Sequence, residues 1–522
     1  MNNNSTATVP RPSSTIAFIL ILSLFIGTRL WHLTSSCLWF DEIFSVHAAH
    51  HDWSQLIRFV AADIIHPPLF YALLKVWIAI GGESLLWLRL FPALTSIAVV
   101  IPFFLLCREV GLRSAETKLA LLLLAVNGYL IKYAQEVRMY SLLLFLSVCS
   151  FWLFIRFFKA PADARKQLVV LTIVNLLLVY THYYGWLVVA AEAVIVMFWR
   201  RHKLLDLFIA VGVLLIAFSP WVYAVTSYSS PGDLRQNIGW IARPRLSDIA
   251  QFLILLGEPF YFRQSNVEPL YYRGSALIGF LLLGVPILVL VWQMVRRRRR
   301  DKDYVAGAIE WLLVFLMVPL VLAFLLSWIL PHSVWGTRHL IILAVPYSLL
   351  AAIALHRLHL FWVKTTVFVV LACWLFLAGT IFLMSRQTTF IWCAWEQLAR
   401  QIAQQPAHDT PVKVYAFEDL IAYHLWFALG QGSSGFKVGV IKQVSGLQED
   451  PAYFLPRSFA DIATLDLSQF AEEESWIAFR DYSWDEKRPP LKTLAERGYK
   501  VGSVLKVSAG GQEAFLVHVS KN

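Results

Sequence analysis

Charged residues are scarce in this chain of 522 residues: Asp, Glu, Lys and Arg make up 15%, against 58% hydrophobic residues. A soluble protein usually carries about a quarter charged residues, so water is excluded as the main solvent of this chain. The mean hydropathy of +0.60 agrees with that conclusion. The composition therefore indicates an integral membrane protein.

Cysteine is also scarce, and its spacing gives no sign of a metal site or a disulfide scaffold. None of the five cysteines forms a CxxC pair or a Cys/His ligand pattern: they are Cys37, Cys107, Cys149, Cys373 and Cys393. We therefore expect neither a zinc site nor a disulfide framework. Tandem repeats are absent as well. The only low-complexity segment is the polar start, and we expect residues 1–14 to be a disordered cytoplasmic N-terminus.

Long apolar runs are what the sequence has instead. A helix needs about 20 apolar residues to cross the hydrocarbon core, and eleven stretches approach that length: 15–31, 86–107, 117–133, 139–158, 167–181, 184–199, 204–226, 274–295, 309–330, 339–355 and 362–383. The first could pass for a signal peptide, but the many spans that follow favour a retained helix. A further stretch, 67–81, is short, opens with two prolines and carries Lys75.

Basic residues lie in short clusters between the apolar runs, and these clusters orient the chain. The net charge of +11 would suit nucleic acid, but clusters between spans are typical of cytoplasmic loops. If 67–81 lies along the surface, the basic loops fall on the side of the N-terminus: 108–118, 159–166, 200–203, 296–300 and 356–364. We therefore interpret 67–81 as a juxtamembrane or re-entrant helix, and we expect a plasma (inner) membrane protein with no nucleic-acid partner. We expect the amino end of the chain to lie in the cytoplasm and the carboxyl end to lie outside.

The chain after residue 385 has a different composition, with frequent polar residues and short β-rich runs such as 412–417, 436–441, 476–479, 501–507 and 514–519. Helix-like stretches at 395–404 and 419–428 lie among them. The sequence therefore predicts an all-α polytopic membrane protein over 15–385, with about 11 transmembrane helices plus juxtamembrane helices. A small extracytoplasmic α/β domain is predicted over 386–522.

Polar side chains collect in the turns that this orientation places outside. The loop 32–85 contains the adjacent carboxylates Asp41 and Glu42, then His66 before the two prolines. His66 either contacts a substrate phosphate or is an ordinary interfacial histidine. A carboxylate at a membrane interface loses solvation and usually has a partner or a task, although a solvated turn or a helix-start charge remains the alternative. Arg89, at the outer end of the next span, either contacts substrate or reaches the lipid headgroups.

Three further outer turns add polar candidates. The turn near residue 135 supplies Gln135, Glu136, Arg138 and Tyr140, where a local Glu136–Arg138 pair is the alternative to binding. His182 and Tyr183 lie in an aromatic belt that any membrane interface would have. Arg338 and His339 open a later span, and an arginine there runs against the charge bias. An arginine fork suits phosphate oxygens, so this set favours displacement at a carbon that carries a lipid phosphate.

The order of these motifs resembles the GT-C glycosyltransferase superfamily, in the bacterial branch similar to protein O-mannosyltransferases and the lipid A aminoarabinose transferase. The matching pieces cover most of residues 15–355: Trp39-Phe40-Asp41-Glu42, His66-Pro67-Pro68-Leu69-Phe70-Tyr71, Leu88-Arg89-Leu90, Tyr133 to Tyr140, and Thr337-Arg338-His339-Leu340 with Pro346 behind it. Many relatives have Arg-Pro-Tyr and Arg-Tyr where this chain has Arg138-Met139-Tyr140 and Arg338-His339. Those departures leave the substrate contacts of Tyr140 and His339 open.

The resemblance implies an inverting transferase with a polyprenyl-phosphate sugar as donor and a lipid, polysaccharide or protein hydroxyl as acceptor. It maps the base onto Asp41, with Glu42 as its neighbour, and a second acidic position onto Glu136. Asp41, Glu42 and Glu136 also offer oxygen ligands to Mg²⁺ or Mn²⁺, but no spacing demands a metal, and the cofactor stays open. The rival interpretation is a transporter or lipid flippase. The spans have few charges at their centres, which argues against it.

Overall fold

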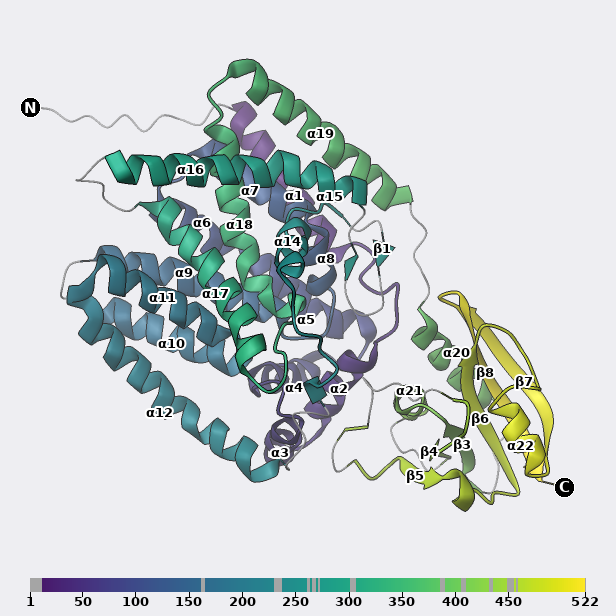
Figure 1. Cartoon of the computed structure of the whole chain (residues 1–522). Coiled ribbons are helices and arrows are strands. Elements are labelled where there is room, and N and C mark those ends of the chain that lie inside the picture. Colours follow the sequence, from purple (N-terminus) through teal and green to yellow (C-terminus); the bar gives the residue numbers. More distant parts are fainter. Residues whose placement is uncertain are drawn as a thin grey trace, which may run out of the picture.

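A helical bundle over residues 12–384 and a smaller domain built around a sheet over 390–521 make up the structure, a computed structural model (Figure 1). It describes residues 12–160, 165–229, 237–260, 263–264, 269–270, 273–300, 307–384, 390–404, 410–430, 435–447, 455–456 and 459–521. Of the predicted disordered segment 1–14, residues 1–11 lie outside the described residues. Pro12 to Ser14 belong instead to the first helix, which corrects the boundary.

The first half of the bundle is formed by the following helices: α1 (Pro12–Leu30), α2 (Phe40–His50), α3 (Trp53–Asp63), α4 (Leu69–Gly81), α5 (Leu85–Ala98), α6 (Val100–Val110), α7 (Ser114–Val126), α8 (Gly128–Ala134), α9 (Tyr140–Lys159), α10 (Arg165–Thr181), α11 (Gly185–Trp199), the 3₁₀ turn η1 (Arg201–Lys203) and α12 (Leu204–Tyr228). The predicted spans 139–158, 167–181, 184–199 and 204–226 each correspond to one of these helices.

The second half contains α14 (Leu246–Leu255), a two-stranded pair β1 (Arg263–Gln264) and β2 (Pro269–Leu270), α15 (Arg273–Gly279), the π-helical η2 (Phe280–Gly284), α16 (Val285–Arg300), α17 (Ala308–Ile329), the 3₁₀ segment η3 (Thr337–Leu343), α18 (Ala344–His356) and α19 (Phe361–Met384). Within the described residues, seven helices are long and apolar enough to cross a membrane: 85–110, 140–159, 201–228, 274–298, 308–329, 337–356 and 361–384. The chain is thus a polytopic membrane protein, as its composition predicted.

Helix α4 covers the ambiguous stretch 67–81. Its 13 residues are too few to cross the hydrocarbon core. The amine of Lys75 donates hydrogen bonds to the carbonyls of Ala49 and His51, at 3.2 and 2.7 Å. These carbonyls belong to the carboxyl end of α2, where a cation is favourable. The lysine in this apolar stretch therefore joins two helices of the loop 32–85.

The predicted span 117–133 is not continuous, which corrects the sequence analysis. It divides at Asn127 into α7 and α8, and the Asn127 side chain accepts the amide of Leu130 at 2.9 Å as the N-cap of α8. The helix end frees carbonyls inside the bundle, and Arg29 donates to those of Leu124 and Ala125 at 2.7 and 2.8 Å. Buried backbone groups need such partners, so Arg29 and Asn127 together stabilise the break.

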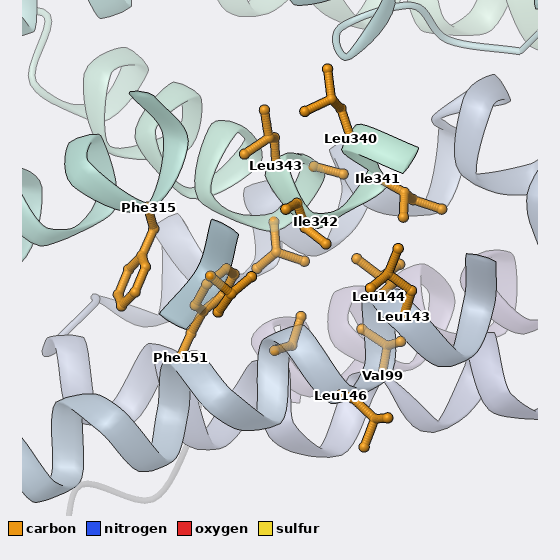
Figure 2. Close-up of a cluster of buried hydrophobic side chains, with 14 of the residues drawn as sticks. Val99, Leu143, Leu144, Leu146, Phe151, Phe315, Leu340, Ile341, Ile342 and Leu343 are labelled. Carbon is orange, nitrogen blue, oxygen red and sulfur yellow. The ribbon is translucent and has the colours of Figure 1, made fainter. Parts of the chain in front are cut away.

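The core of the bundle lies along α9 and the continuous segment η3–α18. In the 18-residue apolar window of each span, 89% of the residues are buried for 337–356 and 78% for 140–159, against 17% for 361–384 and 22% for 201–228. Figure 2 shows Leu340 to Leu343 of η3 packed beside Leu143, Leu144 and Phe151 of α9, with Phe315 of α17 alongside. Helices α12 and α19 lie at the periphery (Figure 1), and their exposed apolar side chains face the lipid.

The smaller domain is a mixed six-stranded sheet in the order β5-β4-β3-β6-β8-β7. Its elements are α20 (Ile391–Ala403), β3 (Val412–Ala416), α21 (Asp419–Ala428), β4 (Phe436–Lys442), β5 (Ala463–Asp466), η4 (Leu467–Gln469), β6 (Glu474–Asp481), α22 (Leu491–Glu496), β7 (Tyr499–Ala509) and β8 (Gln512–Lys521). Strands β3 to β6 pair in parallel and the last two antiparallel. The predicted α/β character is confirmed, and β5 is the strand that the sequence analysis missed.

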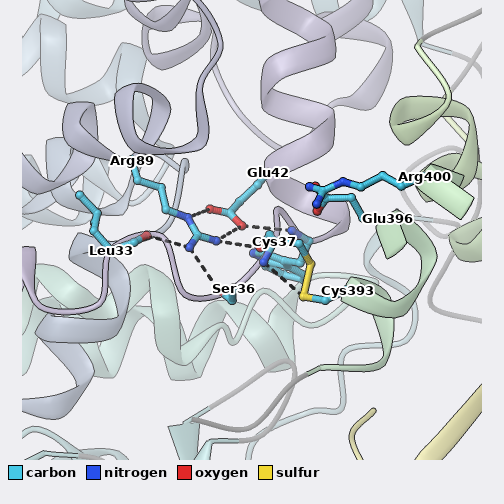
Figure 3. Close-up of a disulfide and its surroundings, with 9 residues drawn as sticks. Leu33, Ser36, Cys37, Glu42, Arg89, Cys393, Glu396 and Arg400 are labelled. Atoms are coloured by element: carbon cyan, nitrogen blue, oxygen red, sulfur yellow. Dashed lines mark hydrogen bonds and ion pairs between the residues drawn. A yellow bond between two sulfur atoms is a disulfide. The ribbon is translucent and has the colours of Figure 1, made fainter. Parts of the chain in front are cut away.

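A disulfide joins the two parts, contrary to the expectation drawn from cysteine spacing. Cys37, in the loop before α2, is bonded to Cys393 in α20 across 356 residues of sequence (Figure 3). Local spacing reveals a pair only when both cysteines lie near each other in the chain, which explains the miss. The bond fixes the start of the C-terminal domain to the loop that carries Asp41.

Candidate active site

Asp41 lies in contact with two of the three arginines that the sequence analysis singled out, Arg138 and Arg338. It is the second residue of α2, and its Oδ2 is 3.1 Å from Nη1 of Arg338 and 3.8 Å from Nη2 of Arg138. The three side chains come from the start of α2, the turn between α8 and α9, and the start of η3. Segments almost 300 residues apart thus converge on one carboxylate.

These side chains open into a cavity of about 160 Å³, which is large enough for several water molecules. Its polar lining residues are Asp41, Asp63, His66, Arg138, Asn237, Arg338 and His339, and its apolar ones are Trp39, Phe40, Phe44, Ile65, Ile238, Trp240, Ile241 and Pro456. Pro456 belongs to the C-terminal domain, so both parts of the chain line the cavity.

Arg138 is buried and held in one orientation. Its Nη1 donates to the backbone oxygen of Asp41 at 3.2 Å, to Ser45 Oγ at 3.3 Å and to Tyr71 Oη at 3.3 Å. Its side chain is only 4% exposed. A guanidinium fixed in this way presents its remaining donors in set directions, as bidentate recognition of an oxyanion requires.

Glu42 points away from this cavity. Its oxygens accept the backbone amides of Trp39 and Val137 at 3.1 and 2.9 Å, and its Oε2 forms an ion pair with Arg89 at 3.2 Å. Arg89 also donates to the carbonyls of Leu33 and Cys37, at 3.0 and 2.8 Å (Figure 3). Both side chains are at most 5% exposed. In this structure they hold the loop 33–42 in place.

Gln135, Glu136 and Tyr183 likewise lie outside the cavity lining. Gln135 Nε2 donates to the carbonyls of Arg29 and Trp31 at the end of α1, at 3.1 and 2.8 Å. Tyr183 Oη donates to the Ile64 carbonyl at 3.0 Å.

Glu136 lies 3.7 Å from Lys132, and burial raises the pKa of its carboxyl to about 7. The sequence suggested a local pair of Glu136 with Arg138. In the structure Glu136 pairs with Lys132 instead.

His66, His182 and His339 form a cluster whose ring centroids are 4.5 to 6.1 Å apart. Tyr140 stacks on the ring of His339 at 6.0 Å. His66 and His339 line the cavity, whereas His182 lies behind them. Burial and the nearby Arg138 keep the pKa of His66 well below its ordinary value, and burial lowers that of His182 to about 3. Both imidazoles are therefore neutral.

The same three histidines are the described side chains grouped closely enough to hold a metal ion, with one ring nitrogen of each within 4.8 Å of the others. Their hydrogen bonds do not fit that role. His66 Nδ1 lies 3.4 Å from the donor Nη2 of Arg138, and His182 Nδ1 accepts the amide of Tyr184 at 3.0 Å. A neutral ring that accepts at Nδ1 carries its proton on Nε2, so Nε2 has no lone pair for a metal. Two guanidiniums nearby also repel a cation.

Two polar residues of the cavity were missed by the sequence analysis. Asp63 ends α3, and Asn237 donates its amide hydrogen to the Asp63 carbonyl. Asp63 carried a usable signal, because it is another carboxylate in the loop 32–85. Asn237 carried none, since it is a single amide in the long segment between the predicted spans 204–226 and 274–295.

Comparison with known proteins supports the fold but gives no sequence match. No family model matches the chain, and no curated protein matches it. Among solved structures, ArnT from Cupriavidus metallidurans in the apo state matches over 97% of this chain and 98% of its own, with a TM-score of 0.56 and 15% identity. The same protein bound to undecaprenyl phosphate matches with a TM-score of 0.54 and 13% identity, over 97% of both chains.

The archaeal oligosaccharyltransferase AglB from Archaeoglobus fulgidus matches over 80% of this chain and 64% of its own, with a TM-score of 0.49 and 13% identity. That score is too low to add to the argument. The match to ArnT extends over nearly the whole chain, the C-terminal domain included. The resemblance drawn from the motifs is thus confirmed at the level of the fold: this chain has an ArnT-like fold.

Proposed function

We propose that this protein is an inverting membrane glycosyltransferase. It moves a sugar from a polyprenyl-phosphate donor to an acceptor hydroxyl on the outer face of the membrane. Asp41 is the base: it takes the proton of the acceptor hydroxyl as that oxygen bonds to the anomeric carbon. The bond from the anomeric carbon to the phosphate oxygen breaks, and polyprenyl phosphate leaves with the electron pair.

The contact of Asp41 with two arginines is the observation that carries this proposal. As Asp41 takes the proton it loses its negative charge, while the departing phosphate gains one. Arg138 and Arg338 can therefore exchange a carboxylate partner for a phosphate partner with no change in the charge around them. Fixed donors placed where charge develops are among the strongest sources of rate enhancement. Because phosphate leaves readily without protonation, no general acid is required.

Two further observations support the lipid-linked donor and the outer face. ArnT, whose fold this chain shares, has been solved with undecaprenyl phosphate bound. The disulfide Cys37–Cys393 joins the segment just before the cavity residue Trp39 to α20, and structural disulfides are formed in compartments such as the periplasm and not in the cytosol. The basic loops then lie on the cytoplasmic side, which agrees with the positive-inside rule.

A turnover assay tests the proposal. The full-length protein in nanodiscs would be offered radiolabelled polyprenyl-phosphate sugars, with membrane extract as the source of acceptors. We expect free polyprenyl phosphate and a labelled product from the wild type. Loss of a general base costs about a hundred- to ten-thousand-fold in rate, so Asp41→Asn should lose turnover to that extent.

The matched control is Asp52→Asn, the same substitution at the exposed N-cap of α3, where asparagine caps equally well. This variant should keep wild-type turnover. Full activity of a folded Asp41→Asn protein would refute the assigned base. Solute uptake into vesicles without any sugar transfer would favour the transporter instead.

A further inference from the structure

Arg338 follows a segment that has no regular structure of its own. Residues 333–336 belong to no helix or strand and are largely buried. Without a ladder of backbone hydrogen bonds, such a segment needs side chains to satisfy its amides and carbonyls. Ser327 Oγ accepts the amide of Val334 at 3.2 Å in this way. The direction in which Arg338 leaves the backbone therefore depends on side chains from other elements.

Two buried tyrosines from different helices hold this segment. Tyr184, at the N-cap of α11, accepts the amide of Gly336 at 3.4 Å, and its hydroxyl donates to the Val334 carbonyl. Tyr129 of α8 donates its hydroxyl hydrogen to the Thr337 carbonyl at 2.7 Å. One hydroxyl thus bridges two backbone groups of the segment, and the other binds the last peptide group before the arginine.

Neither tyrosine lines the cavity, so both hydroxyls act on it through the backbone that they hold. The ring of Tyr184 also packs edge-on against His339, with the ring centroids 5.2 Å apart. Gly336 leaves no room for a side chain, since a Cβ there would lie 2.4 Å from His339 Nδ1. Loss of either hydroxyl would leave buried backbone groups without this partner, which is costly unless the segment moves.

Resting on the proposed function, we infer that Tyr129 and Tyr184 are positioning residues that aim the guanidinium of Arg338 at the phosphate of the donor. Arg338 Nη1 lies 3.1 Å from Asp41 Oδ2, at the end of a long side chain. A small displacement of the backbone therefore moves its donor atoms away from the place where charge develops on the phosphate. A misplacement of about 1 Å can cost about a hundredfold in rate.

Binding of polyprenyl phosphate to the full-length protein in nanodiscs tests this inference. A dissociation constant does not depend on the fraction of protein that is folded, so a general loss of folded protein would leave it unchanged. Tyr184→Phe and Tyr129→Phe should each weaken binding by about tenfold, as expected when a hydrogen bond to a charged group is misdirected. The matched control is Tyr180→Phe, which loses a phenol-to-carbonyl bond to Ala217 in α12 and should keep the wild-type dissociation constant.

A second background shows whether the hydroxyls act through the arginine. Arg338→Gln should itself weaken binding by about a hundredfold. In that background Tyr184→Phe and Tyr129→Phe should have no further effect, because coupled residues are not additive.

Wild-type affinity in Tyr184→Phe or in Tyr129→Phe, or the same tenfold loss in both backgrounds, would overturn the inference alone. If one of these variants fails to fold, the other carries the same test. If the wild type does not bind polyprenyl phosphate, the proposed function itself fails.

Discussion

The adjacent carboxylates Asp41 and Glu42 lie in opposite environments, although nothing in the sequence around them distinguishes the two. Successive residues of a helix point about 100° apart, so only one of the two can face the cavity. Asp41 does, and Glu42 turns into the protein, where Arg89 and two backbone amides surround it. Sequence reasoning could mark the pair as unusual, because carboxylates are costly at an interface. It could not say which member turned inward, since that depends on where α2 begins.

At the residue scale, Glu42→Gln should destabilise the protein without a direct effect on the reacting groups. Removing one partner of a buried ion pair leaves the other charge uncompensated, which typically costs about 3–5 kcal/mol. Thermal unfolding in detergent measures this as a lowered Tm. The control is Glu83→Gln, where Glu83 pairs with His50 at the surface and is 43% exposed; exposed pairs contribute about 0–1 kcal/mol. Equal Tm values for the two variants would contradict the structural role of Glu42.

The arginines were predictable for a related reason. The sequence places Arg138 and Arg338 at the predicted outer ends of apolar segments, against the charge bias of such loops, and both line the cavity. Gln135 lies in the same turn but holds the end of α1 instead. A sequence marks a polar turn, and the direction of each side chain in it follows from packing that only the fold determines.

At the scale of elements, one buried histidine of α2 contributes to the packing of α2 against α21. His47 Nδ1 lies 2.8 Å from Tyr423 Oη, and its ring contacts Phe59, Trp426 and Phe459. Burial, followed by the nearby His51 and His50, lowers the pKa of His47 to about 3. In the unfolded chain its pKa is near 6.5, so the folded protein binds fewer protons between these values.

The free energy of unfolding should therefore decrease as the pH decreases from about 6.5 toward 3. The contribution of His47 is fully present above about pH 6.5 and is lost as the pH decreases toward 3. Measured between pH 7.5 and 5, the Tm of the wild type should decrease, and His47→Gln should flatten that decrease. His202→Gln, an exposed histidine of η1, serves as the control and should leave the pH profile unchanged. A wild-type slope retained in His47→Gln would assign the effect to another group.

Irregular elements were the part of the fold that sequence patterns could not predict. Apolar length alone predicts a continuous helix over 117–133. The break at Asn127 depends on partners distant in sequence, namely Arg29 and the Leu256 carbonyl, which accepts the Asn127 amide at 2.7 Å. The 3₁₀ segment η3 is similar: its apolar pattern predicted a span, and its tighter winding is not encoded in hydropathy.

At the scale of the whole molecule, the disulfide joins the two parts that line the cavity. In the non-reduced protein, thiol labelling after denaturation should detect Cys107, Cys149 and Cys373 but not Cys37 or Cys393. Cross-linking across a long loop typically contributes about 2–4 kcal/mol. Cys393→Ser should therefore lower the Tm, whereas Cys373→Ser, an exposed free cysteine, should not. Labelling of all five cysteines without reductant would exclude the bond and weaken the assignment of the cavity to an oxidising compartment.

The proposed mechanism requires the lipid phosphate to take the place of Asp41 as the partner of both arginines. A cryo-EM structure of Asp41→Asn with a polyprenyl-phosphate sugar in a nanodisc would show whether it does. We expect phosphate oxygens about 3 Å from the guanidiniums of Arg138 and Arg338, with the anomeric carbon facing residue 41. A phosphate bound elsewhere, with both guanidiniums still directed at residue 41, would contradict it.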